Sequence, residues 1–224
     1  MTMRLTYENI RLGEAKKAIR AYNGSLYRGI CSTDVDRQAA ELFAHGLAVN
    51  REGIAEQVRF IGKEYGGVAG FPAALRLVDS IADHIHRERA MFHAAASSAQ
   101  SAHPQPVDCR TLEVLYAPFR QRYHGKNNWL VWASKFWHFI GYDAFPIIDT
   151  RVDRFFRLSW RRDPIDRYKR LLRRFHCFVN SRESWLESLI QSDRQRACCA
   201  TKLWDKVFYG VRELELDCRL TAST

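Results

Sequence analysis

The sequence predicts an all-α protein arranged as two helical lobes. Apolar residues recur at every third or fourth position along most of the 224 residues, as on the buried face of a helix. The strict alternation of apolar and polar residues that indicates a strand is almost missing. Apolar residues form 46% of the chain and charged residues 27%, so the chain can bury a core, which excludes the disordered and fibrous classes.

The first hundred residues form the expected N-terminal lobe, 1–100. Their apolar spacing predicts helices over residues 39–47, 54–65 and 71–85. Beyond the third helix the pattern dissolves into an Ala- and Ser-rich stretch, 94–102. Residues 101–108 include Pro104 and Pro106, so we expect them to link the two lobes.

Residues 109–224 form the expected C-terminal helical region. Helices over about 111–123 and 129–140 are joined by four turn-forming residues, which makes a hairpin over 123–135. After Pro146 a new helix is expected to begin at Asp149 or Thr150.

Two further helices complete this region. Asp163 followed by Pro164 is typical of a helix start, and that helix is expected to reach about residue 179. The last helix is expected over roughly 193–214.

Positive charge is concentrated in the second half of the chain. The formal net charge is +10, and residues 151–174 alone hold ten basic and three acidic residues. Helical spacing predicts that these arginines lie opposite the apolar stripes, with Arg151, Arg154, Arg157 and Arg161 on one helix and Arg167, Arg170, Arg173 and Arg174 on the next. These faces are either solvated surfaces or a surface that binds DNA phosphates, and both alternatives stay open.

Residues 125–153, GKNNWLVWASKFWHFIGYDAFPIIDTRVD, combine a hairpin, an apolar helix with Ala-Ser-Lys, and a Phe-Pro-Ile-Ile-Asp segment. This stretch of about 30 residues resembles the helix-hairpin-helix DNA glycosylase superfamily, in particular its divergent 8-oxoguanine-glycosylase-like bacterial branch. The resemblance implies a two-lobed helical fold, a hairpin whose amides hold a DNA phosphate, and a catalytic carboxylate that falls on Asp149.

The stretch departs from the superfamily pattern at two places. The usual hairpin, Leu-Pro-Gly-hydrophobic-Gly, falls on Lys126, Asn127, Asn128 and Trp129, so both glycines are replaced. The lysine that forms a Schiff base in bifunctional members falls on Val131. Lys135 lies one turn further on and would replace that lysine only if the helix is displaced or shortened. The resemblance therefore implies a monofunctional, hydrolytic enzyme, with Lys135 as a pocket or phosphate cation.

Asp149 has two interpretations that stay open. A carboxylate near C1′ of the sugar stabilises the positive charge that develops when an N-glycosidic bond breaks. Asp at a helix start is also a common N-cap that bonds free amides. A flipped base needs a pocket, for which Trp132, Phe136 and His138 are the candidates unless they belong to the core.

The combined prediction is a protein that binds double-stranded DNA and has base-excision glycosylase activity. Its DNA contacts are expected at Lys126, Asn127 and Asn128 of the hairpin and at Arg151, Arg154 and Arg170. One alternative is a catalytically inactive relic that binds DNA or a protein. Another is a helical interaction protein whose basic face meets an acidic partner.

The sequence gives little support for a metal site, a cofactor or a membrane location. The six cysteines show no metal-ligand spacing, so we expect reduced, mostly buried thiols, no metal site and no cofactor. No run of 18 apolar residues and no signal-peptide core occurs, so we expect a cytoplasmic protein that has no membrane partner and associates with the nucleoid if it binds DNA.

Overall fold

The computed structural model describes residues 5–27, 30–68, 70–102, 107–121, 129–141, 144–158, 163–193 and 200–221. Within these ranges the chain forms eleven α-helices. The only strands described, β1 (Leu26–Tyr27) and β2 (Ile30–Cys31), pair antiparallel over two residues each. The predicted all-α class is therefore confirmed.

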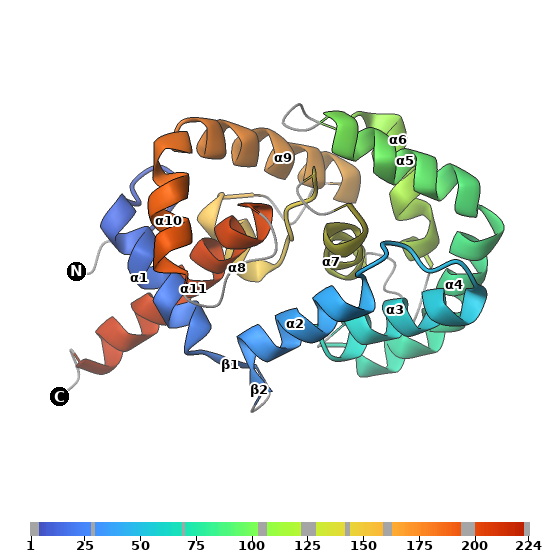
Figure 1. Cartoon of the computed structure of the whole chain (residues 1–224), viewed down its shortest axis with the longest axis horizontal. Coiled ribbons are helices and arrows are strands. Elements are labelled where there is room, and N and C mark those ends of the chain that lie inside the picture. Colours follow the sequence, from blue (N-terminus) through green and yellow to red (C-terminus); the bar gives the residue numbers. More distant parts are fainter. Residues whose placement is uncertain are drawn as a thin grey trace.

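One group of helices packs around α7 (Leu130–Gly141), on the right in Figure 1. Its contacts come from α3 (Arg51–Lys63), α5 (Arg89–Ala102) and α6 (Cys109–Tyr116), and α4 (Val78–Arg87) packs on α3. Because α7 is apolar on almost every face, it needs neighbours on all sides and lies at the centre of this group.

A second group, on the left in Figure 1, is organised around the crossing of α1 (Leu12–Asn23) and α11 (Ala200–Thr221). Gly210 permits this crossing, because a Cβ atom there would lie 1.9 Å from the Ala18 carbonyl oxygen. The short helix α8 (Thr150–Phe155) packs against α11, and α10 (Leu186–Ser192) packs against both α1 and α11.

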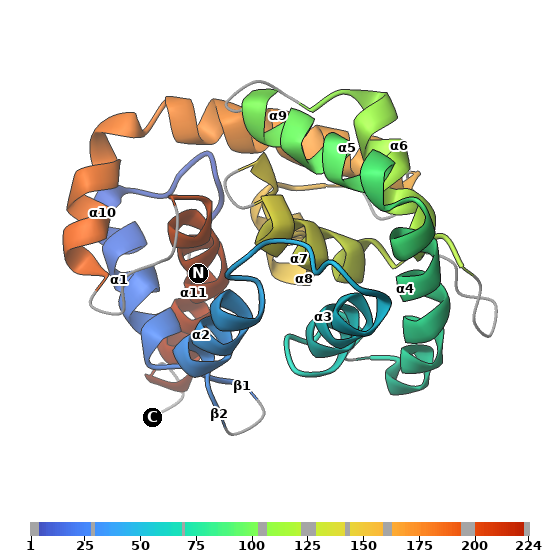
Figure 2. The same cartoon turned by 45° about the vertical axis from the view of Figure 1, so that its right-hand side comes forward.

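Two helices connect the groups. α2 (Ser32–Leu42) contacts both α1 and α3, and α9 (Pro164–Asn180) runs along the top of the molecule to reach α6 (Figures 1 and 2). The buried apolar residues of both groups belong to one continuous core. The pocket described below lies where the two groups meet.

The helix predicted from Asp163 is confirmed in detail. The Asp163 carboxylate accepts hydrogen bonds from the amides of Ile165 (2.8 Å) and Asp166 (3.2 Å), and Pro164 occupies the first turn. The predicted apolar stripe is buried: Ile165, Tyr168, Leu171, Leu172, Phe175 and Phe178.

Several predicted boundaries change. The helix expected over 39–47 ends at Leu42, and the chain then turns through Gly46, whose φ is +71°. The Ala-rich stretch does not leave the helix, since α5 continues to Ala102. Its small residues Ala95, Ala96 and Ala99 are buried, where they allow close packing.

The expected linker 101–108 is helical at its first two residues and buries Val107, while residues 103–106 lie outside the described residues. The helix expected over 111–123 starts at Cys109 and gives way to a 3-10 turn, Ala117–Phe119, because Pro118 interrupts it.

The remaining differences concern helices that the apolar pattern did not separate. α1 and α10 were not predicted, and the last helix begins at Ala200 and ends at Thr221 instead of covering 193–214. Most of the predicted hairpin, residues 122–128, lies outside the described residues.

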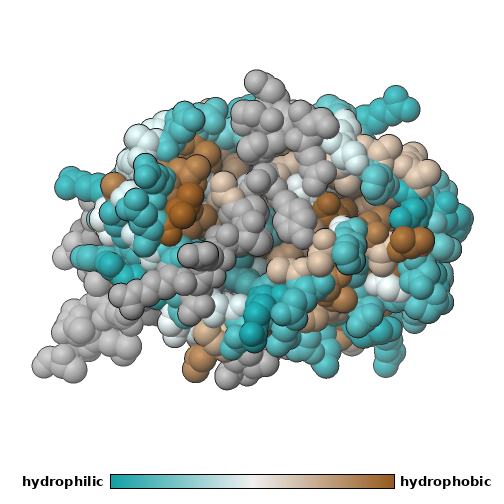
Figure 3. Space-filling view, viewed as in Figure 1, coloured by the Kyte–Doolittle hydropathy of each residue, from teal (hydrophilic) through white to brown (hydrophobic). Residues whose placement is uncertain are grey.

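The surface seen in Figure 3 is largely hydrophilic, with hydrophobic residues in smaller groups. Among the described helices, none has the length and apolar character needed to cross a membrane. The cysteine prediction is partly wrong: Cys109 and Cys177 are exposed and Cys31 is half-buried, because they lie outside the apolar stripes of their helices.

Candidate active site

A pocket of about 450 Å³, including the part open to solvent, lies between α1, α2, α7 and α11. Lys135 and Asp149, both predicted from the sequence, line it. The other polar or aromatic residues of its wall are Tyr22, Ser32, Asp36, Tyr65, Asp205 and Tyr209.

The two carboxylate oxygens of Asp149 differ in their hydrogen bonds. Oδ1 accepts hydrogen bonds from the amides of Arg151 (2.8 Å) and Val152 (2.9 Å), which caps α8. Within the described residues Oδ2 accepts no hydrogen bond. Asp149 is half-buried and lines the pocket, so the predicted capping role is confirmed and leaves one oxygen for a ligand.

The residues next to Lys135 and Asp149 explain how two positions fourteen residues apart meet. Ser134 Oγ accepts a hydrogen bond from the Ile148 amide at 3.1 Å, which joins α7 to the extended segment before α8. The same segment is held at Pro146, whose carbonyl oxygen accepts from the Tyr168 hydroxyl at 2.8 Å. Lys135 follows Ser134 and Asp149 follows Ile148 in the sequence, so these contacts bring Lys135 and Asp149 into one pocket.

Lys135 is a half-buried amine with few fixed partners. Its Nζ donates to the Tyr65 carbonyl oxygen at 2.9 Å and lies 5.4 Å from the centre of the Tyr65 ring. Burial lowers the pKa of Lys135, and the attraction of Asp149 opposes this shift only in part. Lys135 is therefore a better proton donor than an exposed lysine.

Four residues of the pocket wall belong to a charged network, the Lys202 cluster, which consists of Asp36, Asp205, Tyr22, Tyr65 and the buried Lys202. The Lys202 ammonium lies 2.9 Å from Asp36 Oδ1 and 2.8 Å from Asp205 Oδ2. It also contacts the hydroxyls of Tyr65 (2.6 Å) and Tyr22 (3.2 Å), and both hydroxyls donate to Asp36 at 2.7 Å.

The proton equilibria in the Lys202 cluster follow from these contacts. Burial by itself would lower the pKa of Lys202, but Asp205 and Asp36 outweigh it and raise this pKa well above its usual value. Burial, followed by the charge of Asp36, raises the pKa values of Tyr22 and Tyr65 well above 10. The cluster therefore keeps all these protons at neutral pH.

A basic groove of about 310 Å³ adjoins the pocket. Arg151 and Arg154, two predicted DNA contacts, line it with Arg212. The Arg151 guanidinium lies 3.3 Å from the centre of the Tyr209 ring, and Tyr209 also lines the pocket. The contact between Arg151 and Tyr209 therefore joins the groove to the pocket.

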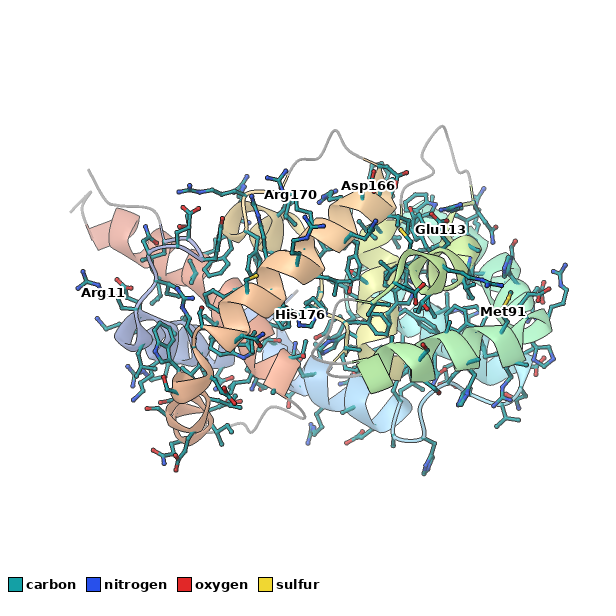
Figure 4. All side chains as sticks on the ribbon, turned by 90° about the horizontal axis from the view of Figure 1, so that it is seen from above. Arg11, Met91, Glu113, Asp166, Arg170 and His176 are labelled. Atoms are coloured by element: carbon teal, nitrogen blue, oxygen red, sulfur yellow. The ribbon has the colours of Figure 1, made fainter. Side chains whose placement is uncertain are left out.

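The third predicted arginine lies on another surface. Arg170 and Asp166 project from one side of α9, whereas His176 lies towards the other side (Figure 4). A broad basic hollow there is lined by Asp166, Lys169, Arg170, Arg173 and Arg174.

The prediction that Arg167 lies outside is wrong. Arg167 is 1% exposed and pairs with buried Asp153 at 3.3 Å, because it lies beside Tyr168 on the inner part of α9.

The expected base-pocket rings lie elsewhere. Trp132, Phe136 and His138 are fully buried and do not line the pocket. Trp132 donates to the Val58 carbonyl oxygen at 2.9 Å and His138 Nδ1 to that of Phe145 at 2.9 Å, so both are fixed in the core. The aromatic side chains that line the pocket are instead Tyr22, Tyr65 and Tyr209.

Two further predictions concern the hairpin and a metal site. Lys126, Asn127 and Asn128 lie outside the described residues, so their predicted contacts remain predictions. Among the described His, Cys, Asp and Glu side chains, no group of three is placed to hold a metal ion.

The sequence analysis missed the Lys202 cluster. One signal was present, since Lys202, Asp205 and Tyr209 recur at three- and four-residue spacing and share a helix face. Their partners Asp36 and Tyr65 lie far away in the sequence, and no local pattern connects them.

Comparisons of the chain with protein-family models, with curated proteins and with solved structures find no match.

Proposed function

We propose that the protein binds double-stranded DNA and hydrolyses the N-glycosidic bond of a base that enters the Asp149 pocket. The observation that carries the proposal is the Oδ2 atom of Asp149, which has no hydrogen bond within the described residues and belongs to the same pocket as the Lys135 amine. The resemblance of residues 125–153 to helix-hairpin-helix glycosylases, and with it their two-lobed fold, is part of the proposal.

The chemistry assigns one task to each of these groups. As the bond from C1′ to the base nitrogen breaks, Asp149 stabilises the positive charge on the sugar and accepts a proton from the attacking water. The water oxygen forms the new bond to C1′. Lys135, whose pKa is lowered, donates a proton to the departing base. The products are a free base and an abasic site.

The basic surfaces supply the DNA contacts in this proposal. Arg151 and Arg154 lie beside the pocket and bind the phosphates that flank the flipped base. Arg170 and its neighbours on α9 contact a more distant part of the duplex.

The test is incubation of the protein with duplexes that carry single oxidised, alkylated or deaminated bases, followed by detection of free base. We expect release of a base and an abasic site that breaks only after alkali or heat treatment. Replacement of Lys135 by Met should slow release and flatten the pH profile on its alkaline side, because the donor that loses its proton there is gone.

Two outcomes would change the proposal. Strong borohydride trapping of a covalent complex, lost in Lys135→Ala, would make Lys135 a nucleophile and the enzyme bifunctional. Tight, salt-dependent DNA binding without release of any base would instead favour an inactive, DNA-binding relic.

A further inference from the structure

The polar groups of the pocket wall differ in whether they can still bind a ligand. In Asp36, Oδ1 accepts from Tyr65 and Lys202, and Oδ2 accepts from Tyr22. The hydroxyls of Tyr22 and Tyr65 use their only protons in these bonds. These three residues are therefore occupied and shape the wall without offering a donor to a ligand.

Asp205 is the residue of the Lys202 cluster that keeps capacity for a ligand. Its Oδ2 is fixed by Lys202 at 2.8 Å, and within the described residues Oδ1 accepts no hydrogen bond. Asp205 is only 7% exposed, yet it lines the pocket. A carboxylate oxygen that has no fixed donor and belongs to a pocket-lining residue can accept a hydrogen bond from an N–H group of a ligand.

Two other charged groups of the pocket have tasks in the proposed function. The proposed function assigns Asp149 Oδ2 to the sugar and Lys135 to the departing nitrogen. Asp205, four residues before Tyr209 on the same face of α11, remains to contact the edge of the base.

We propose that Asp205 is a specificity-determining residue that selects bases with an amino group over the corresponding bases with a carbonyl group. The amino group donates to Oδ1, whereas a carbonyl oxygen in its place faces a carboxylate and is repelled. This inference rests on the proposed function, since it takes the pocket to be a base site.

Matched free bases test the selection without DNA and without catalysis. Adenine and hypoxanthine, and likewise cytosine and uracil, differ by the replacement of an amino group with a carbonyl, which also gives the neighbouring ring nitrogen a hydrogen. We expect, by equilibrium dialysis, that the amino member of at least one pair binds at least about tenfold more tightly, as expected for loss of a hydrogen bond to a charged group.

The variant Asp205→Asn should lose or reverse this preference, because the Asn amide can donate to a carbonyl oxygen. Asp79→Asn removes an exposed carboxylate on α4 that does not line the pocket, and it should retain the preference. Thermal melting of each variant reports whether it folds, and the wild-type preference is informative by itself if Asp205→Asn does not. Equal affinities within both pairs, a preference for the carbonyl members, or no binding at millimolar concentration would each overturn the inference.

The base-release assay separates this inference from the proposed function. Release of bases without regard to their amino groups would contradict the role of Asp205 and leave the enzyme activity in place. Selective binding of amino bases without any release from DNA would contradict the enzyme activity and leave the role of Asp205 in place.

Discussion

Helices α9 and α11 both carry many charged residues, but they place them differently. On α9, Arg173 is exposed and Lys169 and Arg170 are half-buried, while the apolar stripe faces the core. On α11, Lys202, Asp205 and Lys206 are all buried, and each has an ion-pair partner. Apart from Arg167, which is buried against Asp153, the charges on α9 thus meet solvent, whereas Lys202, Asp205 and Lys206 of α11 lie in the protein interior.

The difference indicates which charged residues stabilise the fold. An exposed ion pair contributes little, because water solvates both partners well. A buried charge has lost its water and depends on its partners, so its removal leaves an uncompensated group. We therefore expect changes on α11 to affect stability and changes on α9 to affect binding of DNA.

The largest effect on stability is expected for Lys202→Met. It leaves buried Asp205 without its ion-pair partner, and loss of one member of a buried pair typically costs about 3–5 kcal/mol. Chemical denaturation measures the loss. Arg37→Ala, which breaks the exposed pair with Asp34, is the matched control and should cost less than about 1 kcal/mol. Equal losses in the two variants would show that the buried cluster does not stabilise the fold.

A smaller effect is expected for the double variant Arg154→Glu and Arg170→Glu. It should weaken binding to duplex DNA by about tenfold or more for all sequences alike and lower the dependence of affinity on salt by about two phosphate contacts. Fluorescence anisotropy over a salt series measures both quantities.

Arg59→Glu is the control for this variant, since it reverses an exposed charge on α3, opposite α9 (Figure 1). Unchanged affinity in the double variant, or an equal loss in the control, would contradict the proposal that Arg154 and Arg170 bind DNA.

A further effect on stability concerns alkaline pH. The pKa values of Lys202, Tyr22 and Tyr65 are all raised in the folded protein, so the folded protein holds protons that the unfolded chain releases. The free energy of unfolding should therefore be constant up to about pH 10 and fall as pH rises further, by up to ~1.4 kcal/mol per pH unit for each such proton.

Melting temperatures between pH 8 and pH 11.5 check this dependence. Lys202→Met should show a shallower fall than the wild type. A wild-type melting temperature that stays constant to pH 11 would contradict the buried network.

Local patterns predicted those parts of the fold that depend on local chemistry. The start of α9 at Asp163 needed only a capping side chain and a proline, and its stripe needed only the helical period. Asp149 was found as a cap by the same reasoning. Helix α10, seven residues long, is too short for periodicity to define it.

The pocket depends on contacts between distant residues. Lys202 meets Asp36 and Tyr65 only because α11, α2 and the end of α3 converge in space. Trp132 was expected in the pocket because aromatic rings suit a base, but α7 is apolar on nearly all sides and most of it is buried in the core. Lys135, which the sequence analysis gave as a pocket or phosphate cation, lines the pocket together with Asp149.

Base release by Asp149→Asn, compared with Asp163→Asn, tests the central claim most directly. Both aspartates cap helices through Oδ1, and Asn caps about as well as Asp, so both variants should keep nearly the wild-type stability. Asp149 also faces the pocket, whereas Asp163 does not line it. We predict that Asp149→Asn lowers the rate of base release by about a hundredfold or more and that Asp163→Asn leaves it unchanged. Equal rates in the wild type and Asp149→Asn would contradict the account and reduce Asp149 to a helix cap.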